Sequence, residues 1–336
     1  MDKSSPACYT QGMEFPRSSV LLMLPLCCSS VLAQGGNSLN KWDVESMYVQ
    51  ARAMLEDRSI QDVSSVPMLL ETSAREGHTE AARLLLDVYE GKFKGLNAKP
   101  EHALRLTRRL AEEEKLDKIQ GGDELRTEAM YRLALFLEKG VGCAPEKTEA
   151  YKWIQQASGR GKAGAKVEEA RFLMNGIGTS PNPKRAWKLL YKQAKKNPHT
   201  PHVFFYMGHM CDRGIGMRRD ARKAFELYRL GGILNDAQCL NNLGTMFEKG
   251  HPTPQDYEIA YRLYRKAAEL GNKEASANMQ RLAFKEGIRA SNRSQTPYRT
   301  RIDNATQHII HALPVAPETQ ERLISWLMLS PANEET

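Results

Sequence analysis

A group of glycines recurs along the chain at nearly even spacing, and this periodicity limits the possible folds more than any other feature. Ten residues after each of the last four glycines stands an alanine that precedes an aromatic residue. A period in this range is typical of a solenoid built from stacked units. The glycines are Gly91, Gly140, Gly176, Gly214 and Gly250, at spacings of 49, 36, 38 and 36 residues. The alanines are Ala150, Ala186, Ala224 and Ala260.

Each unit reads as two antiparallel helices. The glycine follows an apolar segment such as "EAMYRLALFLEK", at the place where a residue in the left-handed conformation commonly ends a helix. Beyond the loop, Ala260, Leu263, Tyr264 and Ala267 have the i, i+3, i+4, i+7 spacing of one apolar helical stripe. One helix pair cannot bury both of its faces, so neighbouring units are expected to stack.

Two further positions of the unit have a structural explanation. Four residues before the repeated alanine stands a side chain that can cap the second helix or favour its positive end. Six residues before the glycine the side chain is mostly small, which lets two helices approach closely. The capping candidates are Glu146, Asn182, Asp220 and Asp256. The residues at the second position are Leu85, Ala134, Ala170, Gly208 and Gly244.

The last clear unit, "LGTMFEKG…DYEIAYRLYRKAAELGNKEA", resembles the Sel-1-like repeat family, a relative of the tetratricopeptide repeats. The resemblance implies an all-α fold, an α-solenoid of antiparallel helix-pair repeats forming a right-handed superhelix. Four units match well, from about Glu128, Gly164, His202 and Asn235, and a unit from Glu80 matches more loosely. We therefore expect N-terminal helices or a partial repeat over 34–79, a solenoid of about five units over 80–285, and a linker with C-terminal capping helices over 286–336.

The first residues are typical of a targeting segment. Arg17 precedes an apolar run from Val20 to Ala33, which is too short to span a bilayer and suits a signal-peptide core. Residues 1–33 are thus expected to be a signal peptide, with Met13 as a possible start. An uncleaved N-terminal tail, which would be the chain's only membrane contact, and a lipid anchor at Cys27 or Cys28 are the alternatives. The expected location is the periplasm or cell envelope in a bacterium, and the endoplasmic reticulum lumen or the exterior in a eukaryote.

Charge and cysteine content exclude several classes. The 48 Lys and Arg and 40 Asp and Glu give a net charge of +8, but both signs are interleaved, as on solvated helix faces. A nucleic-acid-associated repeat protein stays an alternative on charge alone, although no recognition motif accompanies it. Beyond the leader only Cys143, Cys211 and Cys239 remain, without a CxxC pair, so neither a disulfide framework nor a metal site is expected.

No catalytic motif has its required context. His308 and His311 lack the spacing and the Glu of H-E-x-x-H, and "GRGKAG" follows a predicted helix rather than a strand. The "SLNK" stretch lacks the partner motifs of a serine β-lactam hydrolase. We therefore expect no enzymatic activity and no cofactor. The alternative is an envelope enzyme or binder acting on peptidoglycan or β-lactam-like substrates, as in cysteine-rich relatives, whose paired cysteines this chain lacks.

What remains is a binding surface for a protein or peptide partner. In the family that the chain resembles, the first helices line the concave face, so the residues three before and one after the small position should point toward a partner. We call these eight residues the candidate row. They are Tyr131, Leu135, Val167, Arg171, Phe205, His209, Asn241 and Thr245. Their mixture would suit an extended peptide, with aromatic residues as apolar anchors and Arg or Asn for backbone and carboxylate groups.

Overall fold

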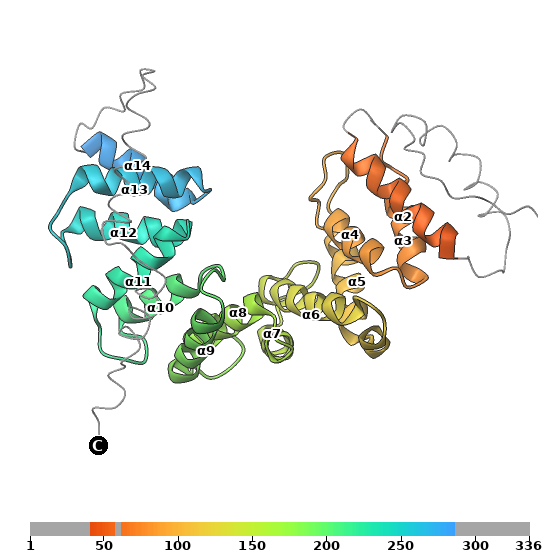
Figure 1. Ribbon diagram of the computed structural model, residues 1–336, viewed down its shortest axis with the longest axis horizontal. Helices are drawn as coiled ribbons and strands as arrows, with labels where there is room; N and C mark the ends of the chain where they lie inside the picture. Colours follow the sequence, from red (N-terminus) through yellow and green to blue (C-terminus); the bar gives the residue numbers. More distant parts are fainter. Residues whose placement is uncertain (1–40, 58–61, 286–336) are drawn as a thin grey trace, which may run out of the picture. The chain divides into compact units, whose positions relative to one another are not determined.

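The computed structural model describes residues 41–57 and 62–285. The predicted targeting segment over 1–33, the H-x-x-H pair and the C-terminal helices expected within 286–336 lie outside the described residues. The chain divides into two compact units, Met1–Ala103 and Leu104–Thr336. All regular structure in the described part is helical, which confirms the predicted all-α class (Figure 1).

The first unit contains the helices α2 (Lys41–Glu56), α3 (Val66–Arg75) and α4 (Thr79–Tyr89), and the division falls within α5 (Pro100–Glu112). Consecutive helices α2, α3 and α4 pack on each other. His78 begins α4, where its Nδ1 accepts a hydrogen bond from the Ala81 N–H, and its Nε2 lies 3.0 Å from Glu45 of α2. One side chain thus caps one helix and links it to another.

The second unit contains a short 3₁₀ helix, η1, and nine α-helices among its described residues. Each α-helix from α6 onward packs against the next, which confirms the predicted series of helix pairs (Figure 1). The elements are η1 (Glu114–Lys118), α6 (Gly122–Lys139), α7 (Lys147–Gly159), α8 (Ala163–Asn175), α9 (Pro183–Lys196), α10 (Val203–Arg213), α11 (Ala221–Ile233), α12 (Ala237–Lys249), α13 (Tyr257–Glu269) and α14 (Lys273–Lys285). The "GRGKAG" stretch forms the end of α7, a turn and the start of α8.

The predicted helix ends are present. The glycines that end α6, α8, α10 and α12 have φ values between 66° and 72°, the left-handed region in which only glycine is unstrained. At the start of the second helices, Asn182, Asp220 and Asp256 each accept a hydrogen bond from the backbone N–H three residues on. Glu146 makes no such bond, so its predicted side-chain cap is wrong. Glutamate carries one more methylene than the capping residues, which suits the position poorly.

The close approach of paired helices depends on the small position. A methyl group added at Gly208 would lie 2.6 Å from the Tyr228 ring, and one at Gly244 would lie 2.7 Å from Tyr264. Both tyrosines stand twenty residues after their glycine. In the two preceding units the small residue is alanine, and the equivalent second-helix residues are the buried Ile154 and Leu190. In each unit, the size of the second-helix side chain therefore matches the space left by the small residue of the first helix.

The insertion in the loosest predicted unit forms η1 and a turn. Asp117 of η1 accepts hydrogen bonds from Arg126 of α6 and from both terminal nitrogens of Arg160, at 3.0 and 2.7 Å for the latter. Arg126 also donates to the Ala111 carbonyl at 3.0 Å. These charged side chains line a polar hollow, and because they bind each other they serve to hold η1 against the start of the array.

Candidate partner-binding surface

The candidate row lies on the four first helices α6, α8, α10 and α12, and six of its members are partly exposed. Those six are Tyr131, Leu135, Arg171, Phe205, His209 and Thr245. Val167 and Asn241 are only 2% and 4% exposed, so their expected contact with a partner is wrong for this structure. Val167 packs in the hydrophobic core, and the Asn241 amide oxygen accepts a hydrogen bond from Asn278 at 3.0 Å.

Arg171 is already held by two carboxylates. Its Nη1 and Nη2 donate to Glu138 of α6 at 2.7 and 2.6 Å, and its Nε donates to Glu168 at 2.6 Å. Burial works to lower the pKa of Arg171, but its hydrogen bonds and charge interactions with Glu138 and Glu168 outweigh burial and raise it. The role first expected for Arg171, binding a partner's carboxylate, therefore conflicts with the geometry, because all three guanidinium nitrogens bind acceptors within the protein.

A second ion pair has the same spacing. Arg281 of α14 donates to Glu248 of α12 at 2.6 and 2.7 Å, 33 residues earlier, as Arg171 does to Glu138. The Tyr264 hydroxyl donates to the same Glu248 at 2.7 Å and lies 3.1 Å from the Thr245 hydroxyl. These two ion pairs each tie one first helix to the next.

The middle of the row lacks this ion pair. Asp212 stands two residues before Gly214, where Glu138 and Glu248 stand in their units, but 33 residues later the chain has Thr245 instead of an arginine. Asp212 pairs with Arg219 of the following loop, at 3.4 Å. The row between the two ion pairs consequently exposes uncharged and aromatic side chains.

Aromatic rings gather on α10 at this place. The Phe205 ring lies 5.0 Å from Tyr206, 6.0 Å from His209 in a stacked arrangement, and 6.5 Å from Tyr228 of α11. Burial lowers the pKa of His209, and the positive charge of Arg213 acts in the same direction. His209 is thus a neutral imidazole at neutral pH, able to donate one hydrogen bond and accept one.

Tyr131 lies close to a lysine of the same chain. The Lys162 ammonium lies 5.8 Å from the centre of the Tyr131 ring. Burial raises the pKa of Tyr131 to about 12, and the nearby carboxylates of Glu168 and Glu128 act in the same direction. Tyr131 therefore remains protonated across the physiological range and offers a partner a ring and a hydroxyl.

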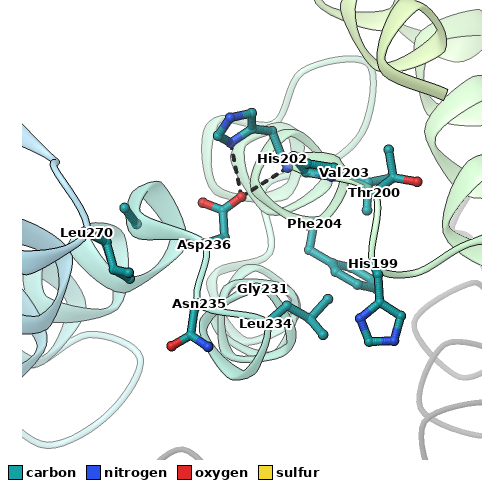
Figure 2. Close-up of a pocket in the computed structure, with 12 residues that line it drawn as sticks. His199, Thr200, His202, Val203, Phe204, Gly231, Leu234, Asn235, Asp236 and Leu270 are labelled. Atoms are coloured by element: carbon teal, nitrogen blue, oxygen red, sulfur yellow. Dashed lines mark hydrogen bonds and ion pairs between the residues drawn. The ribbon is translucent and has the colours of Figure 1, made fainter. Parts of the chain in front are cut away.

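A separate cavity of about 310 Å³, which no sequence pattern predicted, lies where the loops before α10 and α12 meet (Figure 2). Asp236 begins α12, where one carboxylate oxygen accepts from the N–H groups of Gln238 and Cys239. Its other oxygen accepts from the His202 N–H and lies 3.0 Å from His202 Nδ1. His202 and Asn235 have left-handed φ values of 60° and 58°, which only the folded backbone reveals.

The His202 and Asp236 side chains shift each other's pKa. The hydrogen bond that Asp236 accepts from His202 raises the pKa of His202, against the opposite effect of burial. Burial works to raise the pKa of Asp236, but the bonds from His202 and from backbone N–H groups outweigh it and lower that pKa. The pair therefore favours a charged His202 beside an ionised Asp236 and links the start of α10 to the start of α12.

Comparison with protein families identifies the repeats of the second unit. The Sel1 repeat model matches residues 127–162, 170–198, 205–236 and 237–272. The chain carries four Sel1 repeats. They fall on the helix pairs α6 with α7, α8 with α9, α10 with α11 and α12 with α13, which confirms the four well-matched units expected from the sequence.

One solved structure supports the same fold. A Sel1 repeat protein from Oxalobacter formigenes aligns with a TM-score of 0.53 and 22% identity, over 83% of this chain and 100% of its own. Two others align at a TM-score of 0.42. One is c5321, a protective antigen of uropathogenic Escherichia coli with an SLR fold, at 18% identity over 72% of this chain and 57% of its own. The other, described as a Sel1 repeat protein, comes from Klebsiella pneumoniae, at 16% identity over 65% of this chain and 99% of its own. At 22% identity, the likeness to the Oxalobacter formigenes protein concerns the fold alone.

Two of the three described cysteines are buried within the Sel1 repeats. Cys211 and Cys239 are fully buried, and burial raises the pKa of Cys211 to about 12 and that of Cys239 well above its usual range. Within 41–57 and 62–285 no group of three His, Cys, Asp or Glu side chains could hold a metal ion. Over the same residues, no helix combines the length and the apolar character that crossing a membrane requires.

Proposed function

We propose that this Sel1 repeat chain is a non-enzymatic scaffold that binds a partner protein through the exposed members of the candidate row. Sel1 repeat proteins are generally protein-interaction scaffolds. The observation that carries the proposal for this chain is the set of partly exposed aromatic side chains on two of the first helices, Tyr131 on α6 and Phe205 with Tyr206 on α10. Aromatic residues are enriched at the centres of protein interfaces, because they bury a large apolar area with few rotatable bonds.

The geometry favours a rigid recognition surface. The flanking ion pairs of Arg171 with Glu138 and of Arg281 with Glu248 fix neighbouring first helices, so the side chains between them need little ordering on binding. Preorganisation of this kind lowers the entropy lost in association. An export compartment, with residues 1–33 as the targeting segment, is part of the same proposal and rests on the sequence of that segment.

The far end of the array supports a capping role for the C-terminal residues. Gln280 of α14 occupies the repeat position that Gly244 holds in α12. Gly244 leaves space for the Tyr264 ring of its own unit. The larger Gln280 leaves no such space for a second helix that carries a tyrosine at the matching position. Phe284 is nevertheless 93% exposed in the described part of the chain. We include in the proposal that the amphipathic segments 302–313 and 317–329 cover this end, since an exposed phenylalanine at the last turn of α14 offers them an apolar contact.

Site-specific photo-cross-linking tests the scaffold proposal. A photoreactive phenylalanine analogue replaces Phe205 in one variant and Lys188, an exposed residue on the second helix α9, in a matched control. After irradiation in the native cell, the expected result is a discrete adduct from position 205 that position 188 does not give. Identical adduct patterns from both positions, or none from 205, would contradict binding through the candidate row.

A further inference from the structure

Two carboxylates share one arginine on the first helices. Arg171 of α8 donates two hydrogen bonds to Glu138 of α6 and one to Glu168, which lies one turn earlier on its own helix. Two negative charges and one positive charge leave this cluster with one negative charge in excess. The three side chains are between 13% and 20% exposed, and charges interact more strongly at such partly buried sites than in bulk water. The cluster therefore attracts a further cation.

The acceptor that this cluster leaves open can be reached from solvent. Glu168 binds Arg171 through Oε2, and its Oε1 accepts no hydrogen bond within residues 41–57 and 62–285. This oxygen is not buried. The hydroxyls of Tyr131 and Tyr206 also lack a hydrogen-bond partner in the described part of the chain, and they are not buried either. A ligand can thus contact each of these atoms without opening the core.

Tyrosines of the two neighbouring first helices lie around Glu168. Burial, and after it the negative charge of Glu168, raises the pKa of Tyr131 on α6 and that of Tyr206 on α10. The Tyr131 hydroxyl lies against α8, since a methyl group added at Gly164 would be 3.7 Å from it. The face of an aromatic ring attracts cations, so rings and carboxylate favour the same kind of ligand. We call Glu138, Glu168, Tyr131 and Tyr206 the Glu168 site.

Two other carboxylates of the first helices lack this excess of negative charge. Glu248 of α12 pairs with an arginine of α14 through both of its oxygens. Glu128 of α6 is bound by two cations, Arg132 and Lys162. A cation is consequently attracted to Glu168 more than to either of these residues.

The donor set favours a basic side chain over a metal ion. A metal ion needs several ligands around one point, and among the described residues no group of three His, Cys, Asp or Glu side chains could hold one. An arginine or lysine side chain needs one open carboxylate oxygen, and it also gains from nearby rings. Both requirements are met at Glu168.

We propose that the Glu168 site binds an arginine or lysine side chain of the partner protein, which donates a hydrogen bond to Oε1 of Glu168 and packs beside the tyrosines. This rests on the proposed function and specifies a residue that the partner must carry. The role first expected for Arg171 is thereby reversed. Arg171 holds two carboxylates in place, and these carboxylates meet the charge of the partner.

Two matched variants separate binding from stability. Glu168 and Glu226 each accept a hydrogen bond from the Nε of an arginine three residues later, at 2.6 and 2.8 Å. Glu226 lies on the second helix α11, outside the candidate row. Replacement by glutamine keeps the size of the side chain and removes its charge. Glu168→Gln and Glu226→Gln should therefore change the unfolding midpoint of the full chain by similar amounts, and only Glu168→Gln should weaken the binding of a cation.

Binding is measured with a displayed library of random 12-residue peptides selected against the full chain. The enriched sequences are synthesised with acetylated N-termini, so that a basic side chain supplies the cation, and are titrated against the wild type and both variants. Each should carry Lys or Arg at a common position. Loss of a hydrogen bond between charged groups should weaken binding to Glu168→Gln about 10- to 100-fold, with Glu226→Gln unchanged within about twofold.

A change in the peptide tests the same contact without altering the protein. Replacing the common basic residue with glutamine should weaken binding to the wild type by a similar factor and leave binding to Glu168→Gln nearly unchanged. Enriched peptides without a basic residue, equal affinity of the wild type and Glu168→Gln, or failure to enrich any peptide would overturn the inference. None of these results would alter a positive cross-link at position 205, which tests the scaffold proposal by itself.

Discussion

Replacing Gly208 with alanine tests the size matching between paired helices. The added methyl carbon would lie 2.6, 2.7 and 3.2 Å from three atoms of the Tyr228 ring, against about 3.5–4.0 Å for an ordinary carbon contact. The ring is 1% exposed and cannot swing into solvent. Overpacking of this degree is at the upper end of the usual range, about 3 kcal/mol. Alanine recovers about 1 kcal/mol through its higher helix propensity. We expect Gly208→Ala to destabilise the chain by about 2 kcal/mol.

The compensating change comes from the neighbouring unit. Combining Gly208→Ala with Tyr228→Leu recreates the pairing of Ala170 with the buried Leu190. The effects of the two substitutions on the free energy of unfolding should therefore be non-additive, with a favourable coupling of at least about 1 kcal/mol in a double-mutant cycle. Urea denaturation of the wild type, both single variants and the double variant measures it. A Gly208→Ala variant as stable as the wild type, or strictly additive effects, would refute the reasoning.

Three further predictions concern ion pairs, caps and pH. Arg171→Ala leaves Glu138 and Glu168 without their partner in a partly buried site and should destabilise by about 2 kcal/mol, whereas Arg52→Ala breaks an exposed pair and should leave stability nearly unchanged; equal effects in urea denaturation would contradict the burial argument. Asp220→Ala should cost about 1 kcal/mol and Glu146→Ala less than about 0.5 kcal/mol, because only Asp220 caps its helix; a reversed order of thermal midpoints would exclude this explanation. His202 has a raised pKa in the folded state, so its stabilising effect is complete below its unfolded pKa of about 6.5 and is lost as pH rises through the folded pKa. The wild type should therefore be more stable than His202→Gln at about pH 6, and this difference in stability should shrink toward about pH 9. A difference that grows with pH would contradict this linkage.

The Asp236 partner extends the pH argument to acid. Its folded pKa is lowered, so the stability that it contributes is present above the unfolded value of about 3.9 and disappears as pH falls through the folded value. The two linkages together place the greatest stabilisation by this pair between about pH 4 and pH 6.5. The cavity beside this pair lies between two successive repeats. The effect of pH therefore concerns the packing of the two repeats on each other more than the stability of either helix.

Local features of the fold followed from the sequence because each is fixed by residues close together in the chain. A glycine after an apolar run ends a helix, and Asn or Asp before the next apolar stripe begins one, whatever lies elsewhere in the molecule. The predictions that needed side-chain detail were less successful. Glu146 has the position and charge of a cap without the bond, and Val167 has the position of a partner-facing residue but packs in the core.

The candidate site depended more on distant residues. Arg171 appeared available to a partner when only its own helix was considered, yet its partner Glu138 lies 33 residues earlier, in another repeat. Arg281 likewise binds Glu248, which lies 33 residues earlier on a helix of another repeat. A repeat pattern places such residues on the same face, but the identity of each neighbour is set by the unit that stacks beside it.

The sequence by itself determined that this chain is an array of helix pairs, because a recurring glycine, a recurring small residue and a recurring apolar stripe leave no other way to bury the apolar faces. The stacking of the repeats decided which polar side chains satisfy each other. That second outcome depends on contacts of a few ångströms between side chains more than thirty residues apart, such as those of Arg171 with Glu138 and of Arg281 with Glu248.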